Sequence, residues 1–342
     1  MALFYIKISL TVLLLILITS CKDAGKTEQQ TGTTGISDTL TSNDHKNFLF
    51  LTEWFDKVGV NQYDLRKKKY KPVWWHPREN VVMLIYKPGN FAAYFLTADK
   101  IINTENIPSF SGLKLFIISN DLSEIKQIDD IGDGVQFTAR WNDDENLELI
   151  FTAVDKTIAN YVNQYTKVFD HYGKLVDSEI RTIDILKNGF PQILPPGNSS
   201  LSPSGKFGVS FKQDTVFLKK ADGDSLEFIS VMKHKLNKLN WSEDEKYLFI
   251  STLDLQNETV KTKNPETSEL FIYSMEADSL IGAFSGAGLK NFISLNDLLI
   301  FDDGFDNSSV INIFNLDKNK VIDIIKPRQG CGLVTMPLLA DK

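Results

Sequence analysis

Hydrophobic and polar positions repeat in one local order along most of the chain. A large apolar residue is followed by a few polar residues that favour turns, and then by a short strand rich in β-branched and aromatic residues. Because Asn, Asp, Ser, Pro and Gly set turn dihedrals, each polar group predicts a tight turn into a strand. The copies begin at Trp75, Trp141, Leu201, Trp241 and, more weakly, Ile293, and strands are expected at Val81–Tyr86, Leu147–Thr152, Phe207–Phe211, Tyr247–Thr252 and Leu298–Phe301.

Two further strands are expected in each unit. A second β-rich run ends in an acidic or glycine-containing turn, and a third run closes the unit. The second runs are Leu113–Ser119, Thr166–Phe169, Thr215–Lys219, Glu269–Ser274 and Val310–Asn315, and the third are Glu124–Ile128, Leu175–Ile180, Leu226–Val231, Leu280–Phe284 and Val321–Ile325. Such internal repetition predicts an all-β fold made of similar small sheets.

The unit resembles the blade of TolB-type and WD-type β-propellers, in which Trp-Ser-Pro-Asp-Gly-Lys precedes a strand. Leu201–Lys206 (LSPSGK) is the closest copy, and Trp241–Lys246 (WSEDEK) is the next. The resemblance covers roughly residues 65–325 and implies a β-propeller of four-stranded blades. A blade takes about 40–50 residues, so the length allows five to seven of them. An open β-sandwich, or two, is the alternative, since its hairpins show similar turn signals.

Stacking explains why a propeller would need these residues. One blade cannot cover both faces of its sheet, so packing against the next blade should bury the large anchor residues. Before the repeats, Asn47–Gly59 has apolar residues at helical spacing and predicts a short helix. After them, the apolar stretch Leu333–Leu339 is expected to supply the strand that closes the ring.

The first 21 residues differ from everything that follows. Lys7 precedes an apolar run of about 11 residues, Ile8–Ile18, which suits a signal peptide and is too short to span a membrane. Ile18–Cys21 (ITSC) resembles the lipobox of bacterial lipoproteins. That resemblance implies a signal peptide over residues 1–20 and a mature chain that begins at an acylated, membrane-anchoring Cys21. The alternatives are a secreted protein cut near Ser20 and a retained anchor helix.

A polar segment separates Cys21 from the repeats. Ile36 and Leu40 are nearly the only apolar residues between Lys22 and Lys46, so this segment cannot bury enough surface to fold. We expect residues 21–46 to be a flexible tether with a reach of roughly 25–30 Å, and residues 47–342 to form the propeller domain. Charged residues such as Lys22 and Asp23 are read by lipoprotein sorting in Gram-negative cells. We therefore expect an outer-membrane lipoprotein that faces the periplasm or the cell surface.

Charge limits the class of partner. The formal net charge is −7, and removal of residues 1–20 takes away only Lys7, which gives −7 − 1 = −8. An acidic body of this kind is poorly suited to nucleic acids, which need basic patches. After acylation of Cys21, the remaining cysteine, Cys331, has no intramolecular disulfide partner and is expected to be a small buried hydrophobe.

No motif in the sequence predicts catalysis. Gly223–Leu226 (GDSL) spells a short serine-esterase motif but falls in an expected hairpin turn, and no Asp-x-x-His follows it. None of the histidines shows metal-ligand spacing; they are His45, His76, His171 and His234. Two acidic clusters carry enough hard oxygen atoms to make weak Ca²⁺ candidates, although neither has EF-hand spacing. They contain Asp129, Asp130 and Asp133, and Asp302, Asp303 and Asp306.

These observations favour a binding module over an enzyme. A lipid-tethered propeller with no catalytic set would present loops to a protein, peptide or glycan partner, and the longest expected loops are Lys87–Phe110 and Asp254–Ser268. One alternative is an envelope hydrolase or lyase with its site at the central channel, which rests on fold analogy. Another is an accessory or toxin-immunity lipoprotein.

Overall fold

The fold of this chain consists almost entirely of antiparallel strands. The computed structural model describes residues 47–88, 92–102, 109–142, 144–154, 157–189, 201–212, 215–220, 226–230, 235–253, 267–287, 291–303, 309–327 and 330–334. All of them lie in one compact unit, His45–Lys342. In this part of the chain the helical element is the short α2 (Ile185–Asn188). None of its helices is long and apolar enough to cross a membrane.

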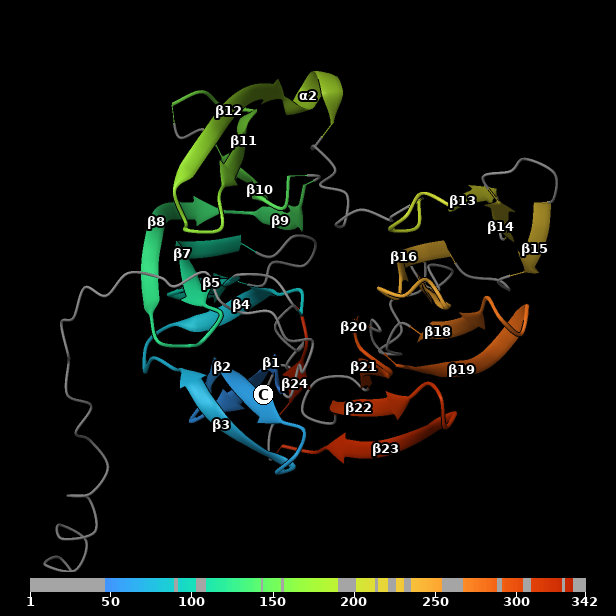
Figure 1. The fold of residues 1–342 in the computed structure, drawn as a ribbon. Helices are drawn as coiled ribbons and strands as arrows, with labels where there is room; N and C mark the ends of the chain where they lie inside the picture. The colour runs from blue at the N-terminus through green and yellow to red at the C-terminus, as the bar shows by residue number, and fades with distance from the viewer. Residues whose placement is uncertain are drawn as a thin grey trace, which may run out of the picture. The chain divides into compact units, whose positions relative to one another are not determined.

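The described strands form six sheets, which we number as blades in chain order (Figure 1). Blade 1 contains β24 (Cys331–Gly332), β1 (Asn47–Trp54), β2 (Lys57–Asp64) and β3 (Lys69–Trp74). Blade 2 contains β4 (Asn80–Ile85), β5 (Ala92–Ala98), β6 (Lys100–Ile102), β7 (Ser109–Ser119) and β8 (Ile125–Gly134). Blade 3 contains β9 (Gln136–Trp141), β10 (Leu147–Val154), β11 (Tyr161–Phe169) and β12 (Leu175–Asp184). Blade 4 contains β13 (Phe207–Lys212), β14 (Thr215–Lys220) and β15 (Leu226–Ser230). Blade 5 contains β16 (Lys235–Trp241), β17 (Tyr247–Leu253), β18 (Thr267–Ser274) and β19 (Ser279–Ala287). Blade 6 contains β20 (Phe292–Leu295), β21 (Leu298–Asp303), β22 (Val310–Asn315) and β23 (Lys320–Ile325).

Each blade is a meander in which consecutive strands pair side by side. Blade 2 contains five named strands but follows the same plan, because β6 continues the register that β5 makes with β7. Thr97 pairs with Lys114 and, three residues later, Lys100 pairs with Ser111. The β5–β6 and β7 hairpin is therefore one long arm that extends past the end of β4.

Apolar clusters join the blades face to face. They link blade 1 to blade 2, blade 2 to blade 3, blade 4 to blade 5, blade 5 to blade 6, and blade 6 back to blade 1. Representative pairs across these seams are Leu51 and Phe95, Leu96 and Leu149, Leu218 and Ile250, Phe249 and Phe292, and Ile300 and Phe50. Burial of each such side chain stabilises the fold by about 1.5–3 kcal/mol. Meandering sheets that stack in chain order and share cores across their faces make a β-propeller, as predicted.

The two ends of the domain meet in blade 1. The C-terminal strand β24 pairs with β1, with Leu51 opposite Gly332 and Thr52 opposite Cys331. The Thr52 hydroxyl also donates to the Gly330 carbonyl at 3.2 Å. Because the innermost strand of blade 1 comes from the end of the chain, unfolding of either terminus would open this sheet.

Side chains of blade 6 hold the same C-terminal segment. The Leu333 amide donates to Asp302 Oδ2 at 3.1 Å, and the Cys331 amide donates to the Ser309 hydroxyl at 2.6 Å. We call Gly330–Val334 with Asp302 and Ser309 the closure clasp. The clasp fixes β24 to a second blade, in addition to its pairing in blade 1.

One sequence prediction, at the N-terminal end of the domain, is wrong. Asn47–Gly59 is not a helix but the β1–β2 hairpin, which turns at Phe55 and Asp56. This strand is buried on both faces, so its nearly continuous apolar run also matches helical spacing. The closing strand is Cys331–Gly332, just before the predicted Leu333–Leu339, of which residues 335–339 lie outside the described residues.

The repeat anchors do not all occupy the same place. Trp141 and Trp241 end the innermost strands β9 and β16, and Trp241 is buried. Trp75 instead lies on the connector from β3 to β4 and is 36% exposed, while Leu201 is 59% exposed. The first copy is out of phase with the others, since its polar stretch precedes an innermost strand rather than following one.

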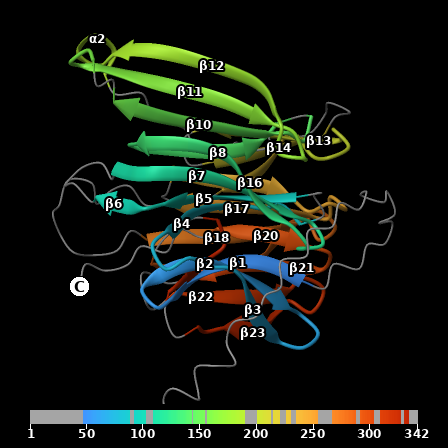
Figure 2. The same ribbon diagram turned by 90° about the vertical axis from the view of Figure 1, so that its left-hand side faces the viewer.

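The meander gives the blades two different ends. At one end, which we call the turn face, short turns such as Asn142–Asn146 and Ser242–Lys246 join the strands. At the other end, which we call the loop face, lie the β1–β2 turn, the ends of β6 and β10, the blade-to-blade connectors and α2. Figure 2 shows β6 and α2 at the same edge of the sheets. The predicted loop Lys87–Phe110 reaches this face at Ile102 and Ser109, and residues 254–266 of the other predicted loop lie outside the described residues.

Candidate functional site

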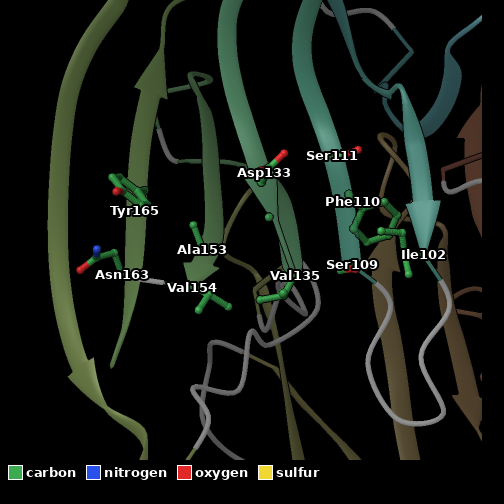
Figure 3. A pocket seen from close by; sticks show the side chains of 11 residues that line it. Ile102, Ser109, Phe110, Ser111, Asp133, Val135, Ala153, Val154, Asn163 and Tyr165 are labelled. Carbon is green, nitrogen blue, oxygen red and sulfur yellow. The ribbon is translucent and has the colours of Figure 1, made fainter. Parts of the chain in front are cut away.

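A pocket opens on the loop face between blades 2 and 3. Its volume is about 430 Å³, within the range of roughly 300–1,000 Å³ that small ligands occupy. The lining residues are Ile102, Ser109, Phe110, Ser111, Asp133, Gly134, Val135, Ala153, Val154, Asn163 and Tyr165. Figure 3 shows the β7 residues on one side and Asn163 and Tyr165 of β11 on the other, with Val135, Ala153 and Val154 between them.

Local irregularities in blade 2 build the first wall of this pocket. The pairing of β7 with β8 shifts between Phe110 and Leu113, and Gly112 between them has a φ of +63°. A side chain at Gly112 would also collide with the Asp99 carboxylate, so glycine is needed there for both reasons. Such a bulge bends β7, and Phe110 pairs with Gly134 beyond it.

A partly buried ion pair anchors the same arm. Glu79 accepts hydrogen bonds from Lys114 Nζ at 2.8 Å and from the Thr97 hydroxyl at 2.9 Å, and Asp99 accepts from Lys114 at 3.3 Å. The hydrogen bond to Glu79 raises the pKa of Lys114 and keeps the lysine charged. The arm that carries Ser109, Phe110 and Ser111 is thus fixed to the connector between blades 1 and 2.

The second wall belongs to the interior strands of blade 3. The Tyr165 ring stacks on Phe151 with centroids 4.8 Å apart, and Phe151 is its cross-strand partner. Asn163 Oδ1 accepts from the Thr182 hydroxyl at 2.8 Å. No described residue hydrogen-bonds the hydroxyls of Ser109, Ser111 or Tyr165. The pocket therefore offers hydroxyl groups that are free to bind a ligand.

The charge of this lining is low and negative. Among the described residues of the lining, Asp133 is the charged one. The nearby Lys167 is occupied, because its Nζ lies 2.6 Å from Asp129 Oδ2. The described residues of this lining therefore disfavour anionic ligands.

An exposed aromatic pair lies elsewhere on the loop face. Phe55 is 81% exposed, and its ring meets Trp75 edge to face with centroids 6.0 Å apart. Trp75 is held in place, because its indole N–H donates to the Trp54 carbonyl at 2.9 Å and its side chain packs on Gly59. Phe55 has a φ of +47°, a left-handed conformation that is unfavourable for a bulky residue. Backbone strain of this kind is concentrated at functional sites.

The acidic candidates from the sequence are used in different ways. Asp129 pairs with Lys167 on blade 3, Asp130 lies opposite Lys114 in β8, and Asp133 lines the pocket. Asp302 belongs to the closure clasp, Asp303 ends β21, and Asp306 lies outside the described residues. The described part of the chain contains no group of three or more metal-ligating side chains.

The histidines and the free thiol do not assemble a catalytic group within the described residues. His171 contacts Tyr172 on the turn face, whereas His76 lies beside Glu79 on the loop face, and His45 and His234 lie outside the described residues. Cys331 is buried, and burial raises the pKa of its thiol to about 12, so the thiolate is not available at neutral pH. Most of the GDSL tetrapeptide also lies outside the described residues.

Lys238 is half-buried near the closure clasp. Lys238 Nζ donates to the Phe292 carbonyl at 2.9 Å and lies 4.5 Å from the centre of the Phe292 ring. Burial lowers its pKa to about 8, against the opposing influence of Asp302. This site was not predicted, because nothing in the sequence shows that β16 and β20 meet.

Comparisons with known proteins give no family for this chain. No family model matches it, and no curated protein is similar in sequence. Among solved structures, TolB from Acinetobacter baumannii has 10% identity over 87% of this chain and 67% of its own, with a TM-score of 0.48. Citrobacter koseri AztD has 10% identity over 84% of this chain and 96% of its own, with a TM-score of 0.42. At these values neither structure bears on function.

The pocket itself could not be found from a motif. Its residues come from β6, β7, β8, β10, β11 and the connector residue Val135, and none belongs to a recognisable signature. The segment Lys87–Phe110, predicted as a loop, instead contains β5 and β6, and the pocket lies at the end of β6 and the start of β7.

Proposed function

We propose that this protein is a lipid-anchored envelope propeller that binds a protein, peptide or glycan partner through its loop face. In this proposal residues 1–20 are a signal peptide, Cys21 carries the lipid, and the protein belongs to the outer membrane of a Gram-negative bacterium. The observation that carries the proposal is the open pocket between blades 2 and 3, with unpartnered hydroxyls, on the loop face. The aromatic pair on the same face supports it, because rigid exposed aromatic residues often dominate binding energy.

The point where the expected tether joins the folded body suits a loop face that points away from the membrane. The folded body begins at Asn47, which pairs with Asp64 at the turn-face end of β1, whereas Phe55 lies at the other end. Eight strand residues separate the two ends by roughly 25 Å. A body held through Asn47 can direct its loop face away from the membrane.

The anchor and the binding surface need separate tests. Labelling of cells with an alkyne fatty acid should mark the wild-type protein, and Cys21→Ala should lose the label and leave the membrane fraction. Equal labelling of both proteins would overturn the lipid anchor.

For binding, the full-length protein would be captured from detergent-solubilised envelopes after crosslinking. Val154→Trp, which fills the pocket, and Trp75→Ala, which removes the aromatic platform, should each lose specific partners. Tyr172→Ala on the turn face should keep them, since Tyr172 is exposed but distant from the loop face. Identical recovery with all three variants would overturn a loop-face binding site.

The enzymatic alternative has no observation of its own. It required the histidines and acidic clusters to converge near the channel, and the described members lie on different blades and faces. A toxin-immunity role also has no feature in the structure that selects it.

A further inference from the structure

We infer that the pocket between blades 2 and 3 binds an uncharged saccharide, an inference that rests on the proposed binding function and specifies its ligand. The first step concerns hydrogen bonding. Asp133, Asn163 and the hydroxyls of Ser109, Ser111 and Tyr165 bring carboxylate, amide and hydroxyl groups to one pocket. A hydroxyl group donates one hydrogen bond and accepts two, so a ligand rich in hydroxyls can satisfy such a mixed set.

The second step concerns the apolar surface between those groups. Phe110, Val135, Ala153 and Val154 contribute carbon atoms to the lining. Phe110 is fixed by an edge-to-face contact with Phe137 at 4.8 Å, and Tyr165 is fixed by its stack on Phe151. A pyranose ring has hydroxyls around its rim and C–H groups on its faces. Its two kinds of surface match the polar groups and the apolar floor.

The third step excludes a charged sugar. Among the described residues of the lining there is a carboxylate in Asp133 and no lysine or arginine. Lys167, farther along β11, is paired with Asp129 and cannot serve as a free cation. An anionic group would lie close to the carboxylate of Asp133, which costs binding energy. Neutral sugars are therefore preferred to uronic, sulfated or phosphorylated ones.

The fourth step disfavours an extended peptide. Peptides commonly bind by adding a strand to an unpaired sheet edge. The strands that supply most of the lining, β7, β10 and β11, are each paired on both sides. Apart from Ala153 and Val154, which pair with β11 alone, these backbones are hydrogen-bonded within their sheets on both sides, so recognition there relies on side chains.

The test uses the full-length protein purified from membranes in detergent. A panel of immobilised neutral oligosaccharides, two to four units long, would be compared with uronic-acid and sulfated panels. The best neutral sugar would then be titrated by calorimetry against the wild-type protein and four variants. Asp133→Asn should weaken its binding by about tenfold or more, because a neutral amide replaces a charged acceptor. Tyr165→Phe should weaken it by several-fold, because the hydroxyl is removed. Val154→Trp should abolish binding, and Tyr172→Phe should leave it unchanged.

Several results would overturn the inference. The inference fails if no neutral sugar binds, if the anionic panel binds better, or if the affinity survives both Asp133→Asn and Val154→Trp. Thermal unfolding of each variant would verify that the fold is retained. Envelope capture separates this inference from the proposed function: if Val154→Trp loses a protein partner while no sugar binds, the binding module stands and the saccharide assignment fails.

Discussion

The two ends of the blades differ in how their polar groups are used. On the turn face, side chains complete the turns themselves: the Ser242 hydroxyl accepts from the Tyr247 amide, and Asn142 accepts from the Asn146 amide. Neighbouring blades are also joined there, because Ser204 donates to Glu245. On the loop face, hydroxyls in a pocket lack partners, and a strained Phe55 is exposed.

This difference separates stability from binding within one scaffold. Both faces cap the same strands, so burial in the blades does not distinguish them. Exposed large apolar residues occur on the turn face as well, at Tyr172 and Leu201, but its turns are tight and internally bonded. We expect changes on the turn face to lower the free energy of unfolding, and changes on the loop face to alter binding first.

The largest expected effect on stability is at the closure clasp. The clasp lies at the loop-face end of the strands, so it is an exception to the division between the two faces. Asp302 is 5% exposed and accepts from the Asn291 amide, the Asn291 side chain and the Leu333 amide. Asp302→Ala leaves these donors buried without a partner and should lower the free energy of unfolding by about 3 kcal/mol or more. Urea unfolding measures this change. Asp177→Ala on the exposed strand β12 is the control, and equal midpoints for the two variants would refute the role of the clasp.

The next largest expected effect is a pH dependence of the free energy of unfolding that comes from Lys238. Burial lowers its pKa to about 8, below the value of about 10.4 in an unfolded chain. Between these values the unfolded state binds more protons, so stability should rise with pH from about 8 to about 10.4, and the penalty is fully present below pH 8. Lys238→Met should remove up to about 3 kcal/mol of this rise. Urea titrations at pH 7, 9 and 10 measure it, and parallel curves for the two proteins would contradict the shift.

A smaller loss of stability is expected on the turn face. The buried Ser242 hydroxyl accepts from the Tyr247 amide at 3.0 Å and donates to Asp244 at 2.8 Å. Ser242→Ala should lower the free energy of unfolding by about 1–2 kcal/mol, because it leaves an amide at the start of β17 without its partner. Ser178→Ala on an exposed strand is the matched control. Binding of the loop-face partner should be unchanged. A loss of binding without a loss of stability would show that the turn face, and not the loop face, carries the binding site.

The repeat in the sequence predicted the turn face well and the loop face poorly. Turn-face residues are local, since Trp241 and the turn after it are contiguous in the chain and carry their own turn chemistry. The propeller followed from that pattern. Ring closure was harder, because the pairing of Cys331 with Thr52 joins positions at opposite ends of the domain.

The candidate site was the least predictable part. Asp133 attracted notice as part of an acidic cluster, yet its place in a pocket depends on β10 and β11, which follow it in the chain. The sequence of Phe55 and Trp75 suggested a buried helix and a buried anchor, whereas both side chains are exposed on the loop face. Exposed aromatic residues look like core residues when only the pattern is read.

The smallest change in stability is expected at Phe55, where an effect on partner binding is easiest to separate from an effect on folding. The β1–β2 turn places Phe55 and Asp56 at positive φ, which suits asparagine better than phenylalanine. Phe55→Asn should therefore raise the free energy of unfolding by about 0.5 kcal/mol while it weakens capture of the loop-face partner. Phe55→Tyr, which keeps the aromatic ring and the strain, should retain the partner. A protein that is both less stable and fully active in capture would show that Phe55 serves the fold, and the distinction between the two faces would then fail at its most exposed residue.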